Sequence, residues 1–201
     1  MFPNLCGAAV LLAFALSAFG QVSAESYAKL VDARLKDMRA LSRSIGDASD
    51  DLTSANRKLS RQLPEEVKAS SAWAQVEETQ LKLDQGMQGF SKLLKTGVAA
   101  DEDYLGRLNR GGGIETGAVV GNLTASAELQ RTMSLVIAKF EELLEQQATA
   151  SRALPESARD LAEFSYAKRV RDATVDALDD SERLCRKRAA EYDSLLHSLK
   201  R

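Results

Sequence analysis

Residues that could carry out chemistry are few in this chain of 201 residues. His197 is the single histidine, and the only cysteines are Cys6 and Cys185. A zinc site, a c-type haem site or a catalytic triad needs several such residues together. Carboxylates are plentiful, but no spacing selects a pair for acid–base work. We therefore expect no catalytic residue, no metal and no cofactor, and we predict that the protein is not an enzyme.

The acidic segment around Asp101 has part of the pattern of a calcium-binding EF-hand loop. Asp101, Asp103 and Gly106 match positions 1, 3 and 6 of that loop. Positions 5 and 12, which should supply oxygen ligands, are occupied by Leu105 and Gly112. A solvated acidic loop explains the segment better than a calcium site does.

Cys185 is open to two interpretations. Its basic neighbours, from Arg183 to Arg188, would lower the pKa of an exposed thiol. An unpaired cysteine in an oxidising compartment could also form a disulfide between two copies, which would make a homodimer. However, Cys185 falls on the apolar stripe of its segment, so we favour a buried, unreactive thiol.

Asn122 begins the sequence Asn-Leu-Thr, which is an acceptor for N-glycosylation in a secreted protein. We expect Asn122 to lie where a loop meets the next helix and to open that helix as its N-cap. A modifying enzyme could reach a residue in that position, so Asn122 is a candidate glycosylation site.

The charge balance argues against nucleic acid as a partner. The formal net charge is −2, and the basic run from Arg183 to Arg188 lies one helical turn from Asp179, Asp180 and Glu182, which largely cancel it. We expect a protein or another surface ligand as the partner. Membrane contact is an alternative that we do not favour, because the apolar stripes are narrow and contain few aromatic residues.

The N-terminal residues 1–24 have the features of a secretory signal peptide. Leu5 to Phe19 is an apolar run, and the small residues Val22 and Ala24 suit cleavage after Ala24. The segment contains no Lys or Arg, which favours a eukaryotic secretory pathway over export to a periplasm. An uncleaved anchor is the alternative. The C-terminal residues show neither a hydrophobic tail nor a retention signal.

Two similar sequences, R-Q-L-P-E from Arg61 and R-A-L-P-E from Arg152, divide the chain into long segments. Proline is suited to the first turn of a helix, and the residue before it is disfavoured in helical conformation. Each Leu-Pro pair therefore predicts the end of one helix and the start of the next. This predicts two helical hairpins, 25–97 and 122–201, with helices beginning at Pro64 and Pro155.

Apolar residues recur every three or four positions in all four segments, which is typical of amphipathic helices and close to a coiled-coil seam. The expected buried stripes are Val31, Leu35, Met38, Leu41, Ile45, Ala48, Leu52, Ala55, Leu59 and Leu63; Trp73, Val76, Gln80, Leu83, Met87, Phe90 and Leu94; Leu129, Met133, Val136, Phe140, Leu143, Gln147, Ala150 and Leu154; and Leu161, Phe164, Val175, Leu178, Cys185, Ala189, Tyr192, Leu196 and Leu199. Lys168, Arg171 and Glu182 interrupt the last stripe, so we expect them at its rim or paired with charges on a neighbouring helix.

Residues 98–121 are rich in glycine and predict a flexible linker between the hairpins. Gly112 and Gly117 have the spacing of a phosphate loop, but Ala118 and Val119 replace the required lysine and hydroxyl residues. The centre of the linker is our candidate partner-binding loop: Arg110, Gly111, Gly112, Gly113, Ile114 and Glu115.

The sequence predicts an all-α protein whose single domain, residues 25–201, is an elongated antiparallel four-helix bundle. A cleavable signal, cysteine-poor alanine-rich helices and two hairpins resemble the extended helical-bundle surface proteins of African trypanosomes. The resemblance implies an architecture and transfers no ligand site. We expect a secreted or cell-surface protein that acts by binding, in a receptor, coat or structural role. The alternatives are an amphipathic-helix lipid carrier and, less favoured, a secreted enzyme.

Overall fold

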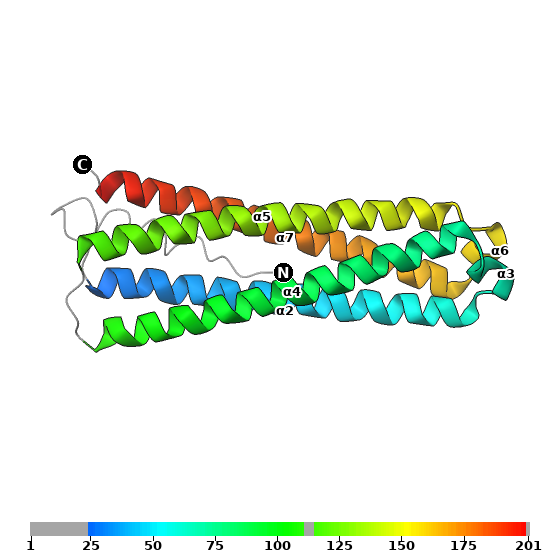
Figure 1. The fold of residues 1–201 in the computed structure, drawn as a ribbon, viewed down its shortest axis with the longest axis horizontal. Helices are drawn as coiled ribbons and strands as arrows, with labels where there is room; N and C mark the ends of the chain where they lie inside the picture. The colour runs from blue at the N-terminus through cyan, green and yellow to red at the C-terminus, as the bar shows by residue number, and fades with distance from the viewer. Residues whose placement is uncertain (1–23, 111–114, 200–201) are drawn as a thin grey trace.

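The protein is all-helical in a computed structural model, which describes residues 24–110 and 115–199. Four long helices, α2 (Ala24–Gln62), α4 (Ser71–Asn109), α5 (Thr116–Arg152) and α7 (Ala162–Leu199), are accompanied by the short helices α3 (Glu65–Lys68) and α6 (Glu156–Arg159). Each long helix packs against two others, in the cyclic order α2, α4, α5, α7. They lie side by side along the long axis, with α3 and α6 together at one end (Figure 1).

The two Leu-Pro pairs end α2 and α5 as predicted, but the next long helix does not start at the proline. Pro64 and Pro155 instead precede the one-turn helices α3 and α6. Helix α4 begins only at Ser71, where the Ser70 hydroxyl caps it by accepting a hydrogen bond from the Trp73 backbone N–H at 3.2 Å. A serine at the N-cap satisfies an otherwise unpaired donor, which explains why α4 starts at this position.

The expected linker 98–121 is shorter than the glycine content suggests. Helix α4 continues through Gly97 and Gly106 to Asn109, and α5 begins at Thr116 rather than at Asn122. A glycine inside a helix costs about 1 kcal/mol relative to alanine. Close packing offsets this cost at Gly97, because a Cβ there would lie 2.6 Å from Met38 Cε on α2. Tertiary packing therefore extends both helices into the stretch that we expected to be a linker.

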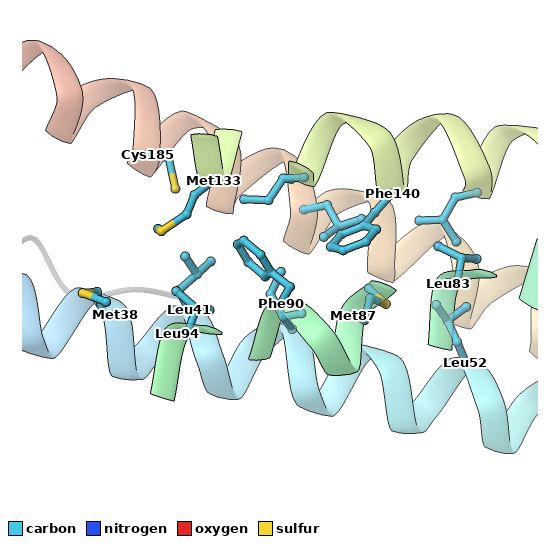
Figure 2. Packing of buried hydrophobic residues seen from close by; sticks show 14 residues of the cluster. Met38, Leu41, Leu52, Leu83, Met87, Phe90, Leu94, Met133, Phe140 and Cys185 are labelled. Atoms are coloured by element: carbon cyan, nitrogen blue, oxygen red, sulfur yellow. The ribbon is translucent and has the colours of Figure 1, made fainter. Parts of the chain in front are cut away.

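The core runs the length of the molecule in three clusters of buried side chains. The middle cluster, drawn in Figure 2, joins all four long helices and consists of Met38, Leu41, Ile45, Leu52, Leu83, Met87, Phe90, Leu94, Met133, Ile137, Phe140, Leu144, Leu178 and Cys185. The corner cluster, beside α3 and α6, contains Leu59, Leu63, Val67, Trp73, Val76, Leu154 and Ala158. The open-end cluster contains Tyr27, Val31, Leu108, Val119, Leu123, Ala127 and Tyr192. Full burial of one such side chain contributes roughly 1.5–3 kcal/mol.

The contact between α4 and α5 depends on a glycine, Gly86. A Cβ on Gly86 would lie 2.7 Å from Cε1 of Phe140, whose ring packs edge-on against Phe90 with 5.9 Å between centroids. At Gly89, by contrast, an added Cβ would meet nothing within 4 Å, so no close contact depends on that glycine.

The stripe predicted for α5 is correct at Met133, Phe140, Gln147 and Leu154 but is displaced by one residue at Val136 and Leu143. Ile137 and Leu144 are fully buried, whereas Val136 and Leu143 are only partly buried and Leu129 is 40 % exposed. Helix α5 packs against both α4 and α7, so its most buried line lies between these two contacts. The prediction assumed a narrow apolar stripe that contacts one partner helix. It therefore placed the centre of the buried face of α5 incorrectly.

Candidate functional site

The most unusual group in the interior is Arg34 on α2, which is only 4 % exposed. Its guanidinium donates to both carboxylate oxygens of Asp101 on α4, with Nε 2.6 Å from Oδ2 and Nη2 bonded to Oδ1. Nη1 reaches α5, where it donates to Asn122 Oδ1 at 3.0 Å and to the Ser126 hydroxyl. A planar guanidinium is suited to a two-point contact with a carboxylate, so one side chain joins three helices.

Two tyrosines enclose this Arg34 network. The Tyr27 hydroxyl donates to Asn122 Oδ1 at 2.6 Å, and burial followed by the nearby Tyr104 raises the pKa of Tyr27. Tyr192 on α7 is 1 % exposed, and burial raises its pKa to about 12. Both phenols therefore remain protonated and uncharged at neutral pH.

A second ionic group joins α7 to α2 near the Arg34 network. Arg188 Nε donates to Asp37 Oδ2 and Nη1 donates to Glu191 Oε2, both at 2.6 Å. Burial alone would lower the pKa of Arg188, but the hydrogen bonds to Asp37 and Glu191 outweigh it, and the pKa is raised. Together the two ionic groups connect all four long helices at the end that carries the open-end cluster.

A third polar layer lies toward the corner end. Gln147 on α5, 1 % exposed, donates from Nε2 to Gln80 Oε1 on α4 at 2.9 Å. Asn56 on α2 donates to the same oxygen, and Gln80 Nε2 donates to Asp84 Oδ1 at 2.7 Å. The sequence placed Gln80 and Gln147 on buried stripes, and the structure shows that they bond to each other there.

Of the three charges that interrupt the α7 stripe, Lys168 lies at the rim as expected, whereas Arg171 and Glu182 bond to serine hydroxyls on α5 rather than to charges on a neighbouring helix. Arg171 is 9 % exposed and donates to the Ser151 hydroxyl at 3.1 Å, and burial lowers its pKa. Glu182 accepts hydrogen bonds from Ser134 on α5 at 3.2 Å and from Arg186 at 2.6 Å. Lys168 is exposed at the rim.

A carboxyl beside this group, Glu141 on α5, has an unusual environment. Its buried Oε1 has no hydrogen-bond partner in the described part of the chain. Burial, followed by the nearby charges of Asp179 and Glu182, raises the pKa of Glu141.

The predicted glycosylation residue Asn122 does not lie at a loop-to-helix junction. It is within α5, partly buried, and its side-chain oxygen accepts from both Tyr27 and Arg34. The structure therefore gives Asn122 a role in holding α5 to α2, and its glycosylation stays a prediction.

Cys185 is buried and unpaired, in agreement with the favoured interpretation. It is 0 % exposed in the middle cluster, and burial raises the pKa of the thiol to about 12. The basic neighbours that would lower this pKa at the surface do not reach the sulfur. A disulfide between two copies would require Cys185 to leave the core.

The candidate partner-binding loop can be described only at its edges, because Gly111, Gly112, Gly113 and Ile114 lie outside the described residues. Arg110 follows the last turn of α4, and Glu115 precedes the first turn of α5. An open groove of about 490 Å³ lies between the start of α2 and the end of α4, lined by Glu25, Ala28, Lys29, Asp32, Leu105, Leu108 and Asn109.

The two motif-like segments are helical where they are described. Asp101 pairs with Arg34, Asp103 pairs with Arg107 at 3.3 Å, and both belong to α4. Gly117, Ala118 and Val119 lie in α5. Over residues 24–110 and 115–199, no group of three or more His, Cys, Asp or Glu side chains is arranged to hold a metal ion, and no described helix could cross a membrane.

The Arg34 network itself was missed by sequence reasoning. Its other members lie 67 to 92 residues from Arg34, and the local motifs that contain Asp101 and Asn122 give no sign of the network. The one available signal was a charged residue, Arg34, immediately before a stripe position. A search for related proteins adds nothing to this description, since no family model, curated protein or solved structure matches the chain.

Proposed function

We propose that this chain is a secreted or cell-surface binding protein without catalytic activity, built as an elongated antiparallel four-helix bundle with coiled-coil-like packing. The cyclic contacts of α2, α4, α5 and α7 support this arrangement, as does the reversal of the chain at α3 and at α6 in Figure 1.

The main support for the proposal is that the reactive side chains are directed into the interior of the bundle. Arg34, Asp101, Tyr27, Asn122 and Cys185 all have their polar atoms directed into the interior, where they hold helices together. The groups that remain for recognition lie on the outside of a long, firmly packed rod. Such a surface is suited to binding a macromolecule along its length or at one end.

Secretion is tested by expressing the full chain with a C-terminal tag in eukaryotic cells. We expect the protein in the medium with Glu25 as its first residue. Retention in the cells with residues 1–24 intact would contradict secretion. The partner can be sought by pull-down with residues 25–201 from the native fluid or host tissue.

The same material distinguishes binding from lipid carriage. A binding protein should saturate with a defined partner and keep its helicity. Flotation with liposomes together with increased helicity would favour the lipid carrier instead. Deletion of residues 111–114 should weaken capture while circular dichroism is unchanged, and unchanged capture would place the site elsewhere on the rod.

A further inference from the structure

The cations of this molecule are unevenly paired. Most Lys and Arg side chains in the described part of the chain form ion pairs. Those on α2 and α4 that form none within the described residues are Arg43, Arg57, Lys58, Arg61, Lys92 and Lys95. Elsewhere the same holds only for Arg110, Arg159, Arg169 and Arg171, which are dispersed over the fold. The Lys and Arg side chains without an ion pair are therefore concentrated on the α2–α4 side.

Most of these cations line a groove between α2 and α4. One part of it, of about 410 Å³, is bordered by Arg57, Lys58 and Arg61. The adjoining part, of about 290 Å³, is bordered by Lys92 and Lys95. The two parts share Asp50 and Gln88, so they form one continuous depression that we call the α2–α4 groove.

The floor of the second part is open because of a glycine. A Cβ on Gly46 would meet nothing within 4 Å, and Met87, which is 1 % exposed, lies beneath this part. Ser91 and the largely buried Ser49 also border this part. A side chain of a partner could enter here without displacing residues of the groove.

The charge along the groove alternates in sign. Asp50 and Asp84 lie between the two cationic regions. Asp84 is held in place by Thr53 and Gln80, which both donate to its Oδ1 at 2.7 Å. The centre of the groove is therefore negative and its two ends are positive.

Contacts between the helices give the separation of the two positive regions. Ser42 lies opposite Ser91 and Thr53 lies opposite Asp84, so Lys92 is level with residues near 42 on α2. Arg57 lies about 15 residues further along α2. At 1.5 Å per residue this is roughly 20 Å.

We propose that the α2–α4 groove binds an acidic segment of a partner protein, with two groups of carboxylates roughly 20 Å apart on either side of a cationic or neutral centre. The inference rests on the proposed function, that this chain acts by binding. A uniform polyanion such as a sulfated glycan would be repelled by Asp50 and Asp84, whereas a segment of alternating charge matches the groove along its length.

The test uses a fluorescein-labelled helical peptide with four glutamates at each end and lysines at its centre. An isomer of identical composition carries the glutamates at the centre and the lysines at the ends. By fluorescence anisotropy at low salt, we expect the first peptide to bind at least tenfold more tightly, and we expect added salt to weaken it. The double variant Arg57→Glu/Arg61→Glu should lower its affinity about tenfold, because two exposed ion pairs are lost and replaced by repulsion.

The matched control is Arg159→Glu/Arg169→Glu, which changes the net charge equally at unpaired cations outside the groove. This variant should bind the first peptide within about twofold as tightly as the unmodified protein, because the altered charges are distant from the groove and screened by salt. Equal loss in both double variants, equal binding of the two peptides, or tighter binding of heparin or anionic vesicles than of the first peptide would overturn the proposal. If the peptide test fails but the pull-down still captures a partner, the groove is not the binding site and the proposed binding function still stands.

Discussion

The buried ion pair between Arg34 and Asp101 gives the sharpest test of how this interior is held together. Replacing Asp101 with alanine leaves the Arg34 guanidinium charged and almost inaccessible, since its side chain is 3 % exposed. Breaking one side of a buried pair costs about 3–5 kcal/mol, because the remaining charge loses its compensation. The Asp101 side chain is 14 % exposed, so water can reach part of the vacated space, and we expect the lower end, about 3 kcal/mol.

The loss is measured by chemical denaturation followed by circular dichroism, with thermal unfolding as a second readout. For a domain of this size, about 3 kcal/mol corresponds to a Tm lower by roughly 6–12 °C. The control is Asp32→Ala, which removes an exposed pair with Lys36 and should cost no more than about 0.5 kcal/mol.

A double variant separates the charge from the packing. Arg34→Met together with Asp101→Ala removes both charges, so it should be more stable than Asp101→Ala alone. If Asp101→Ala costs as little as Asp32→Ala, the guanidinium does not depend on this carboxylate. If the double variant is less stable than the single one, the energetic account of the network is wrong.

Three further outcomes follow from the packing. Gly86→Ala should destabilise the protein by about 1–3 kcal/mol, because its Cβ would press on the Phe140 ring. Gly46→Ala should stabilise the protein by about 0.5–1 kcal/mol, because its Cβ would meet nothing. Equal effects of the two variants in chemical denaturation would contradict the packing described. Cys185 should resist a thiol reagent in the native protein, react fully in denaturant, and run as a monomer on a non-reducing gel; rapid native labelling would show that the core opens there. Glu141→Gln should raise Tm at pH 7. The raised pKa of Glu141 means that the folded state favours the protonated carboxyl, so stability falls as pH rises and Glu141 ionises, whereas glutamine stays neutral. The advantage should shrink as pH falls from the raised pKa toward 4.5, the ordinary value for glutamate, and should be absent below it, so a gain independent of pH would refute this origin.

The sequence predicted the helical class and most of the buried stripes because these depend on local periodicity. Val31, Leu35, Leu83 and Leu94 are all buried as expected, and each needs only its own helix to define its face. The Leu-Pro pairs were equally informative, since proline acts on its immediate neighbours.

The misjudged features depend on contacts between distant residues. Helix α4 passes through Gly97 because Met38, on another helix, uses the space that a side chain would fill. Asparagine is common at helix N-caps, but the side chain of Asn122 forms hydrogen bonds with Tyr27 and Arg34, which lie almost 100 residues earlier. Neither partner can be identified from spacing along the chain. Three conclusions stay predictions: secretion, the resemblance to trypanosome surface proteins, and the candidate partner-binding loop.

Helix α2 begins and α7 ends at the same extremity of the molecule, away from α3 and α6 (Figure 1). Any tether attached through residues before Ala24 or after Leu199 would therefore project α3 and α6 outward as the distal tip. With helices of up to 39 residues, that tip would stand roughly 55–60 Å above the point of attachment. An immobilised copy would offer its flanks, including the seam between α2 and α4, to whatever approaches from the side.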